Sequence, residues 1–439
     1  MKSMHFDYAQ SCLVNKESLD QQQEKLQPEI ERINQARAYN YETDYASINL
    51  PFDEKLIKTI CATVKTTKKH QPTTLVVIGI GGSNLGTIAV LEALRGRFYN
   101  EHHDIKTYFV DTVDSDNIDD IAQLVERELE TGNNIIINVI SKSGTTTETI
   151  ANFEIFLEIL KSHRPYNYHD FVVATTDQDS ALWQLAEQQE FVRLAVPKHV
   201  GGRYSVFSAV GLFPLCFLDI DIENLCIGAQ SGFLLSAHKT LSNNPAAMSA
   251  ALIDTHYKRG NIIHDTFLFS VALGSIGAWY RQLSAESVGK AYNKDQELIN
   301  TGVLPTVSIG STDLHSVAQL YLAGPYNRFT TFVFIGNSIT DLYVPEYPEF
   351  EALVPHIQGK SLNIIMDAIL EGTKRAYFAD KRPFICCMIP EKSAYYIGQL
   401  MQIKMMEIMY LGFLLNVNPF DQPQVEDYKK ETKSILSND

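Results

Sequence analysis

Six hydroxyl side chains surround one lysine in the stretch ISKSGTTTET, which runs from Ile140 to Thr149. The apolar run NIIINVI ends at its first residue, and a helix-like pattern follows it. Short hydroxyl donors beside a lysine at a helix start are the mixture that a phosphate dianion binds. The donors are Ser141, Ser143, Thr145 and Thr146, and Lys142 supplies the charge. The alternative, a capping box of Thr145 and Glu148, explains only two of these residues, so we favour an anion site.

A second loop of this kind is the glycine-rich stretch VVIGIGGSNLG, from Val76 to Gly86. Glycines at the end of a strand let backbone N–H groups approach an anion at the start of the next helix. Neither familiar nucleotide motif fits. Thr87 stands where a P-loop needs lysine, and Asn84 stands where the dinucleotide fingerprint needs its third glycine. The stretch therefore predicts either a tight turn or a small-anion site.

Two stretches carry groups that could move protons. WYRQLSAESVGK, from Trp279 to Lys290, places Glu286 at the end of an apolar helical pattern, and STDLHS contains His315. A carboxylate can take and return a proton beside a carbonyl group, and histidine titrates in the range that acid–base catalysis needs. Each also has an ordinary interpretation, as a solvated glutamate at a helix end and as a partly buried histidine.

Two further stretches carry cations. VGGRYSVFSAVG, from Val200 to Gly211, places Arg203 after two glycines, where little bulk separates a ligand from the guanidinium. Such a cation could stabilise negative charge that develops during a reaction. NPFDQPQVEDYKK carries Gln422 and Lys429, but it could equally be an ordinary charged C-terminal helix.

The elements that position these residues follow an α/β pattern. From Thr74 onward, apolar runs that indicate strands buried on both faces alternate with helical patterns, which predicts parallel sheets covered by helices. The pattern restarts after about residue 225 with three candidate strands, DTFLFSVAL, TTFVFIG and PFICCMIP. We therefore expect two doubly wound, three-layer αβα domains. The expected limits are 1–45 for a helical N-terminal arm, 46–225 for the first α/β domain and 226–439 for the second, with C-terminal helices.

Composition limits the classes of function. The 439 residues carry a formal net charge of −15, which argues against a general nucleic-acid or anionic-membrane surface. The six cysteines include no C-x-x-C pair, and Cys386 and Cys387 lie in an apolar run, so a disulfide framework is not expected. The N-terminus has no apolar core of signal-peptide length, and the most apolar stretch is too short to span a bilayer. We expect a cytoplasmic protein.

Taken in order, these stretches resemble the phosphoglucose isomerase family in its short bacterial form, over roughly residues 45–435. GGRYSVFSAVG is similar to the signature G-G-R-[FY]-[ST], and FDQPQVEDYK is similar to F-D-Q-x-G-V-E-x-x-K. The resemblance implies sugar-isomerase-type (SIS) domains. It also implies reversible isomerisation of glucose 6-phosphate and fructose 6-phosphate in glycolysis and gluconeogenesis, through ring opening and an enediol. A homodimer, a small sugar phosphate as the binding partner and no cofactor are further implications.

The same resemblance implies roles for individual residues. The substrate-binding residues would be Gly82, Ser83, Ser141, Lys142, Ser143, Thr145, Thr146, Glu148, Gly202 and Gln422. Glu286 matches the glutamate that moves the proton between C1 and C2, His315 the ring-opening histidine, and Lys429 the lysine that assists it. Arg203 matches the arginine beside the developing enediolate. The departures from the family's pattern, none of which removes a reacting group, are Lys198, Gln424 and Ser143.

Two other classes of function stay open at this point. A phosphosugar-binding regulator of the same fold would keep the loops at Ser83 and Ser141 without needing Glu286, His315 and Lys429 together. Their joint presence favours the enzyme. A nucleotide-binding α/β protein is disfavoured by the two failed glycine motifs. No clustered His/Asp/Glu spacing suggests a metal, so we expect metal-independent catalysis.

Overall fold

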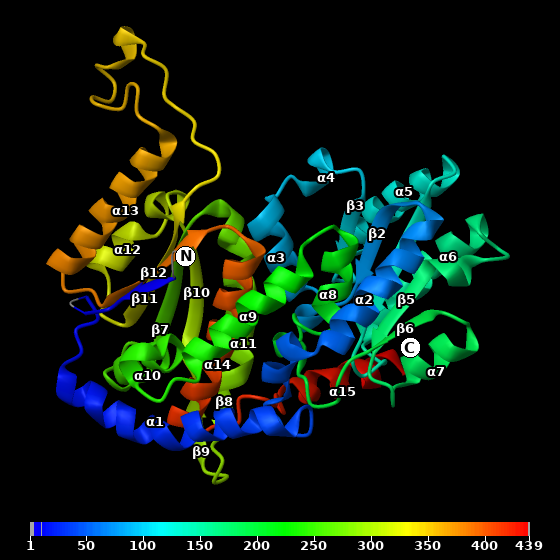
Figure 1. Cartoon of the computed structure of the whole chain (residues 1–439), viewed down its shortest axis with the longest axis horizontal. Helices are drawn as coiled ribbons and strands as arrows, with labels where there is room; N and C mark the ends of the chain where they lie inside the picture. The colour runs from blue at the N-terminus through cyan, green and yellow to red at the C-terminus, as the bar shows by residue number, and fades with distance from the viewer. Residues whose placement is uncertain (1–3, 10, 438–439) are drawn as a thin grey trace. The chain divides into compact units, whose positions relative to one another are not determined.

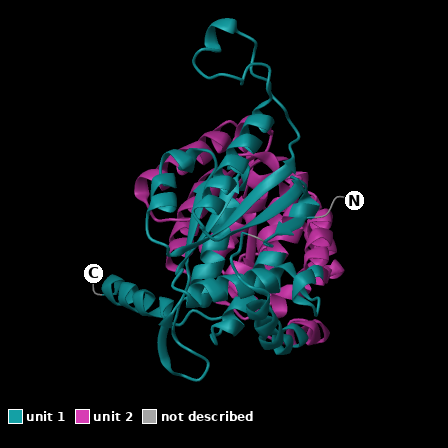
Figure 2. Ribbon diagram, turned by 90° about the vertical axis from the view of Figure 1, so that its left-hand side faces the viewer, with its two compact units in different colours: residues 1–31, 235–396, 403–439 teal, residues 32–234, 397–402 magenta. Residues whose placement is uncertain are grey.

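The computed structural model describes residues 4–9 and 11–437, which divide into two compact units, coloured separately in Figure 2. Unit 1 comprises the described residues within 1–31, 235–396 and 403–439, and unit 2 comprises residues 32–234 and 397–402. Each unit contains its own five-stranded sheet. The helices α1 (Lys16–Ala36), α9 (Ile222–Ser236) and α14 (Ala394–Leu414) contribute residues to both units.

Unit 2 is built on a parallel sheet, of which Figure 1 labels β2, β3, β5 and β6. The strand order is β3-β2-β4-β5-β6. Its strands coincide with five apolar runs of the sequence and are β2 (Pro72–Ile78), β3 (Lys106–Val110), β4 (Asn134–Ile140), β5 (Val172–Thr176) and β6 (Val192–Ala195). The helices of the unit are α2 (Glu54–Thr67), α3 (Leu85–Arg95), α4 (Tyr99–His102), α5 (Ser115–Glu130), α6 (Thr147–His163), α7 (Ala181–Gln188) and α8 (Ala209–Phe217). β4 is buried at every residue after the first, as expected for a strand covered on both faces.

The order of the strands reverses beside β2. β3 pairs with one edge of β2, and the chain then crosses over to place β4 on the other edge. The loops that follow β2 and β4 therefore run in opposite directions at the carboxyl ends of the strands. Ligands of doubly wound sheets bind in the crevice that such a reversal leaves.

Unit 1 contains a second sheet, with the order β1-β12-β11-β7-β10. Its parallel strands are β7 (Ile263–Phe269), β10 (Leu304–Ile309), β11 (Arg328–Asn337) and β12 (Phe384–Glu391), and β1 (His5–Asp7) pairs antiparallel with β12 at the edge. The remaining elements are α10 (Pro245–Lys258), α11 (Gly274–Val288), the hairpin β8 (Lys290–Tyr292) and β9 (Leu298–Thr301), α12 (Ala318–Ala323), α13 (Leu362–Ala379) and α15 (Val425–Leu436). Two doubly wound α/β sheets confirm the expected fold class.

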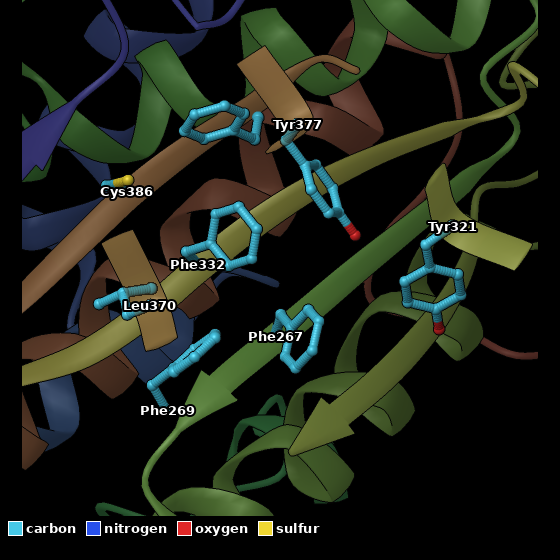
Figure 3. Packing of buried hydrophobic residues seen from close by; sticks show 8 residues of the cluster. Phe267, Phe269, Tyr321, Phe332, Leu370, Tyr377 and Cys386 are labelled. Atoms are coloured by element: carbon cyan, nitrogen blue, oxygen red, sulfur yellow. The ribbon is translucent and has the colours of Figure 1, made fainter. Parts of the chain in front are cut away.

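An aromatic cluster joins α13 to the sheet of unit 1 (Figure 3). The Phe332 ring of β11 lies 5.6 Å from the Phe267 ring of β7 and 5.1 Å from the Tyr377 ring of α13. Burying each such ring contributes about 1.5–3 kcal/mol. The cluster therefore fixes α13 over the strands whose carboxyl ends form one edge of the sheet.

The strand β10 lies outside the three strands expected for this half of the chain. Its sequence, LPTVSI, is too polar to indicate a buried strand. The structure accommodates the polar residues because Thr306 and Ser308 donate to the buried Asp265 Oδ1, at 2.6 and 3.1 Å. The 3-10 turn that carries His315, a candidate for acid–base chemistry, follows β10 directly.

Candidate functional site

The hydroxyl-rich loop of unit 2 is fixed to the neighbouring strand. Ser141 is buried, its backbone N–H donates to the Thr175 carbonyl at 3.2 Å, and its carbonyl accepts from Thr176 Oγ1 at 2.6 Å. The Ser141 and Thr146 hydroxyls lie 2.9 Å apart across the loop. Gly144 has a φ of +69°, in the left-handed region that favours glycine. The loop is therefore a preformed turn that presents its hydroxyl groups at the carboxyl end of β4.

The capping box considered for this loop is not formed. The N-cap of α6 is Thr146, and its side chain makes no capping hydrogen bond. Thr145 instead donates its hydroxyl to Ser143 Oγ at 3.4 Å. Helix α6 thus begins without a side-chain cap, and its N-terminal dipole favours an anion at that end.

Lys142 supplies the cation of the loop from a half-buried position. Burial lowers its pKa, while the nearby Asp177 carboxylate acts in the opposite direction. A partly desolvated ammonium binds an anion more strongly than a fully hydrated one, because less water must be displaced. Lys142 and the four hydroxyl residues of the loop, which contact one another in pairs, are consistent with a cradle for one phosphate group.

The glycine-rich turn and the Gly-Gly-Arg motif are in backbone contact. A Cβ atom placed on Gly82 would overlap the Gly202 carbonyl carbon and the Arg203 nitrogen, so only glycine fits there. Ser205 Oγ donates to the Gly82 carbonyl at 3.2 Å, across 123 residues of sequence. This contact sets the loop that carries Ser83 beside the loop that carries Arg203. The Arg203 side chain is buried, only 2% exposed, which is unusual for an arginine without a functional or pairing role.

In unit 1, Glu286 lies in the last turn of α11. Gln282, one turn earlier, donates its Nε2 hydrogen to Glu286 Oε1 at 3.0 Å. Helix α11 is attached to α14 by a buried hydrogen bond, which the Tyr280 hydroxyl donates to the Glu407 carboxylate. Glu407 also pairs with Lys404 at 2.7 Å. Glu286 is therefore a carboxylate held in a set orientation, which the solvated helix-end interpretation does not account for.

The buried Lys290 joins the end of α11 to the C-terminal segment. Its ammonium donates to the Glu286 carbonyl at 2.7 Å and to the Asp421 carbonyl at 2.6 Å, and it lies 3.2 Å from Asp421 Oδ1. Asp421 immediately precedes Gln422. Lys290 thus fixes the backbone of the segment carrying Gln422 against the backbone of Glu286.

The other expected residues of unit 1 are more exposed. His315 ends a 3-10 turn (Thr312–His315) that is held by Asp313, whose Oδ2 accepts from the Ile309 N–H at 2.7 Å. Lys429, on α15, pairs with Glu426 at 2.8 Å, and Gln422 is exposed. The expected residues therefore divide between the units: Glu286, His315, Gln422 and Lys429 belong to unit 1 and the rest to unit 2.

Sequence reasoning missed Gln282 and Lys290. A signal existed for the lysine, since a basic residue just beyond a helix end commonly binds the last carbonyl groups. Gln282 lies four residues before Glu286, the spacing at which helical side chains meet, but nothing in its type distinguishes it from a surface glutamine.

We expect Lys290→Met to lower both stability and turnover. The change removes the donor of two backbone carbonyls, each of which costs about 1–3 kcal/mol when left unpaired. Chemical denaturation and steady-state kinetics would measure the two effects. The matched control is Lys294→Met, an exposed lysine of the same segment. Equal behaviour of the two variants would contradict the role given to Lys290.

Two searches of the described residues bear on metals and membranes. Over 4–9 and 11–437, the structure brings together no group of three or more His, Cys, Asp and Glu side chains that could hold a metal ion. Across the same residues, no helix has the length and apolar character needed to cross a membrane.

Comparison with known proteins identifies the family. The family model described as "Phosphoglucose isomerase" matches residues 53–340, which include both loops of unit 2, Arg203, Glu286 and His315. The chain belongs to the phosphoglucose isomerase family. Gln422 and Lys429 lie beyond the matched residues, so their family assignment rests on the FDQPQVEDYK stretch.

Individual relatives agree with this assignment. The chain is 32% identical to the glucose-6-phosphate isomerase of Carboxydothermus hydrogenoformans over 82% of its own length and 78% of the relative. It is 30% identical to that of Fusobacterium nucleatum, over 99% and 96% of the two chains. Among solved structures, a hypothetical protein of Thermus thermophilus is similar with a TM-score of 0.86 and 29% identity, covering 99% of this chain and 100% of the other.

Proposed function

We propose that this protein interconverts glucose 6-phosphate and fructose 6-phosphate. Membership of the phosphoglucose isomerase family is the observation that carries the proposal. The held carboxylate of Glu286 and the hydroxyl-rich loop with Lys142 support it, because they supply a proton acceptor and a phosphate cradle. No observation favours the non-catalytic regulator.

In the proposed mechanism, the loop at Ser141 to Thr146 binds the sugar phosphate. His315, assisted by Lys429, opens the ring by moving a proton between the ring oxygen and the C1 hydroxyl. Glu286 then takes the proton from C2 of the aldehyde, and the C–H electron pair becomes the C1–C2 double bond of an enediolate. Arg203 stabilises the C1 oxygen, which gains negative charge. The proton of the C2 hydroxyl then passes to the C1 oxygen, the C2–O bond becomes the new carbonyl, and Glu286 returns its proton to C1 to give the ketose. Gln282 keeps the accepting oxygen of Glu286 in place.

We expect this isomerisation to proceed without an added metal ion. The residues assigned to it include an acid–base carboxylate and a fixed guanidinium, which together replace the Lewis acid of a metal isomerase. The test is a coupled assay of fructose 6-phosphate formation in buffer with and without a strong chelator. Equal rates are expected. Loss of activity in the chelator, restored by a divalent ion, would overturn the mechanism.

We further propose that the protein is a homodimer. The segment 338–361, between β11 and α13, projects from unit 1 (Figures 1 and 2). It exposes large apolar side chains. Among them are Ile339, Leu342, Tyr343 and Leu353, which are 78%, 62%, 66% and 74% exposed. A run of this kind marks a surface that another protein covers, and a second copy of the chain is its proposed partner.

We expect the double change Leu342→Lys and Leu353→Lys to shift the protein from dimer to monomer. Placing two charges in an apolar interface costs free energy that the partner surface does not return. Size-exclusion chromatography with light scattering distinguishes a 49.4 kDa chain from its dimer. Tyr166→Lys, at a residue 94% exposed on unit 2, is the control. A wild-type protein that elutes as a monomer would contradict the proposal.

A coarser prediction and a coarser proposal complete the description. The domain limits 46–225 and 226–439, with a helical arm over 1–45, stay a prediction, and a cytoplasmic location is proposed from the proposed activity. Cell fractionation tests the location.

A further inference from the structure

The sheet of unit 1 repeats the strand arrangement of unit 2. In both, the first parallel strand has the second on one edge and the third on the other, and the fourth lies beyond the third. β7 thus corresponds to β2, and β11 corresponds to β4. The order of strands in unit 1 therefore reverses between β7 and β11, as it does between β2 and β4. At such a reversal the loops diverge and leave a crevice beyond the carboxyl ends of the strands.

A cavity of about 420 Å³ occupies this position in unit 1. The ends of β7 and β11, the residue after β12 and the first turns of α13 line it. Its polar side chains are Ser270, Asn337, Ser338, Asn363, Asp367 and Lys392. Apolar side chains form its floor, among them Phe269 and Leu370 of the aromatic cluster (Figure 3). We call this cavity the unit 1 pocket. Its volume lies within the range of small-molecule sites.

Two opposite charges line the unit 1 pocket without pairing. Within the part of the chain that the structure describes, neither the Lys392 ammonium nor the Asp367 carboxylate has an opposite charge within 4.0 Å. Glu371, one turn further along α13, behaves differently, because Lys374 and Arg375 pair with it at 3.0 and 3.2 Å. Partial burial also raises the pKa of Asp367, and no cation opposes that effect. The pocket thus presents one cation and one anion that a ligand could satisfy.

We propose that the unit 1 pocket binds a small phosphorylated sugar, with Lys392 at the phosphate and Asp367 accepting hydrogen bonds from hydroxyl groups. Inorganic phosphate would satisfy Lys392 but would offer Asp367 at most one or two P–OH donors beside its own negative charge. A neutral sugar would satisfy Asp367 and leave Lys392 unused. A ligand with one anionic end and several hydroxyl donors fits both. The existence of the cavity does not depend on the proposed function. The choice of a sugar phosphate as its ligand does rest on the proposed function.

The unit 1 pocket differs from the hydroxyl-rich loop of unit 2, and the difference indicates that the two sites have separate roles. The loop after β11 is the long segment 338–361, where unit 2 has the short hydroxyl loop after β4. None of the residues assigned to proton transfer lines the unit 1 pocket. A sugar phosphate bound there would therefore act as an effector and not as a reacting substrate.

Binding stoichiometry tests this proposal on the full chain. The probe is D-glucitol 6-phosphate, an open-chain polyol that cannot isomerise, titrated by isothermal calorimetry. We expect two molecules per wild-type chain, one in Lys142→Ala with Ser143→Ala, and one in Lys392→Ala. In the chain that lacks the unit 2 cradle, Lys392→Ala should weaken the remaining site roughly tenfold or more, because a charge-assisted hydrogen bond is lost. Lys374→Ala is the control, since it removes a lysine of unit 1 outside the pocket.

A second variant separates the two ends of the ligand. Asp367→Asn should weaken glucitol 6-phosphate in the unit 1 pocket while leaving weak binding of inorganic phosphate unchanged or stronger. One molecule per wild-type chain, with no residual binding once the unit 2 cradle is removed, would overturn the proposal. Absence of isomerase activity in the wild-type chain would instead contradict the proposed function, and the stoichiometry would still report on the pocket.

Discussion

Replacing Glu286 by glutamine should lower the turnover of glucose 6-phosphate by about 10²–10⁴-fold, the usual contribution of a general base. The change removes the proton acceptor and keeps the shape. The glutamine oxygen can still accept from Gln282 Nε2, so the side chain should keep its orientation. Inhibition by a non-reacting phosphosugar should therefore change little, because the phosphate cradle lies on other residues.

Solvent exchange provides the decisive measurement for Glu286→Gln. Incubation with glucose 6-phosphate in D₂O, followed by NMR, reports deuterium at C2. Uptake should fall in parallel with turnover, while ring opening continues through His315 and Lys429. The control is Glu371→Gln, an exposed carboxylate of α13. Rapid deuterium uptake with blocked conversion would assign proton abstraction to another residue, and loss of inhibitor binding would make Glu286 a structural residue.

The double change Lys142→Ala and Ser143→Ala should weaken phosphosugar binding by about 10²–10⁴-fold. Each lost charge-assisted hydrogen bond contributes about 1.5–3 kcal/mol, and about 1.4 kcal/mol corresponds to a factor of ten. Competitive inhibition by glucitol 6-phosphate, measured in the Lys392→Ala background so that the unit 1 pocket does not contribute, reports the effect at the reacting site. Lys161→Ala, at the far end of α6, is the matched control.

Phosphate recognition through Lys142 also predicts a pH dependence. Burial lowers the Lys142 pKa, so the charged form is lost as pH rises through a value below that of an ordinary lysine. Wild-type affinity for the phosphosugar should fall over that alkaline range, whereas the double variant should show no such fall. A glucitol 6-phosphate inhibition constant that is the same in the wild type and in the Lys142→Ala, Ser143→Ala variant would exclude the phosphate cradle.

The parallel core was predictable from sequence because its signals are local. Strands buried on both faces appear as apolar runs, and β2, β4 and β5 each coincide with one. The edge strands β3 and β6 were expected to be buried in the same way, but they are only partly buried and contain Lys106 and Arg193. β10 was not predicted because the hydroxyl groups of Thr306 and Ser308 donate to Asp265, a partner that is remote in sequence. Long-range hydrogen bonds of this kind leave no periodic pattern.

For the site, too, local signals could be read from the sequence and long-range contacts could not. The hydroxyl loop was found from residue types alone, since four short donors and a lysine exceed what a turn requires. The capping alternative could not be rejected until the structure showed Thr146 at the N-cap without a side-chain bond. Lys290 was missed because its importance depends on Asp421, which comes next to it only after folding.

The contact between Gly82 and Gly202 bears on how mutations in this family are interpreted. Any substitution at Gly82 places an atom inside the backbone of the other loop, whereas a Cβ on Gly202 would come no closer than 3.6 Å to Gly82. These two glycines contact each other but do not tolerate substitution equally. A missense change at Gly82 would reduce the amount of folded protein in the cell, while alanine at Gly202 would leave protein levels intact. Defects at these two positions of the chain would therefore have separate origins, in loss of folded protein at Gly82 and in a change confined to the loop itself at Gly202.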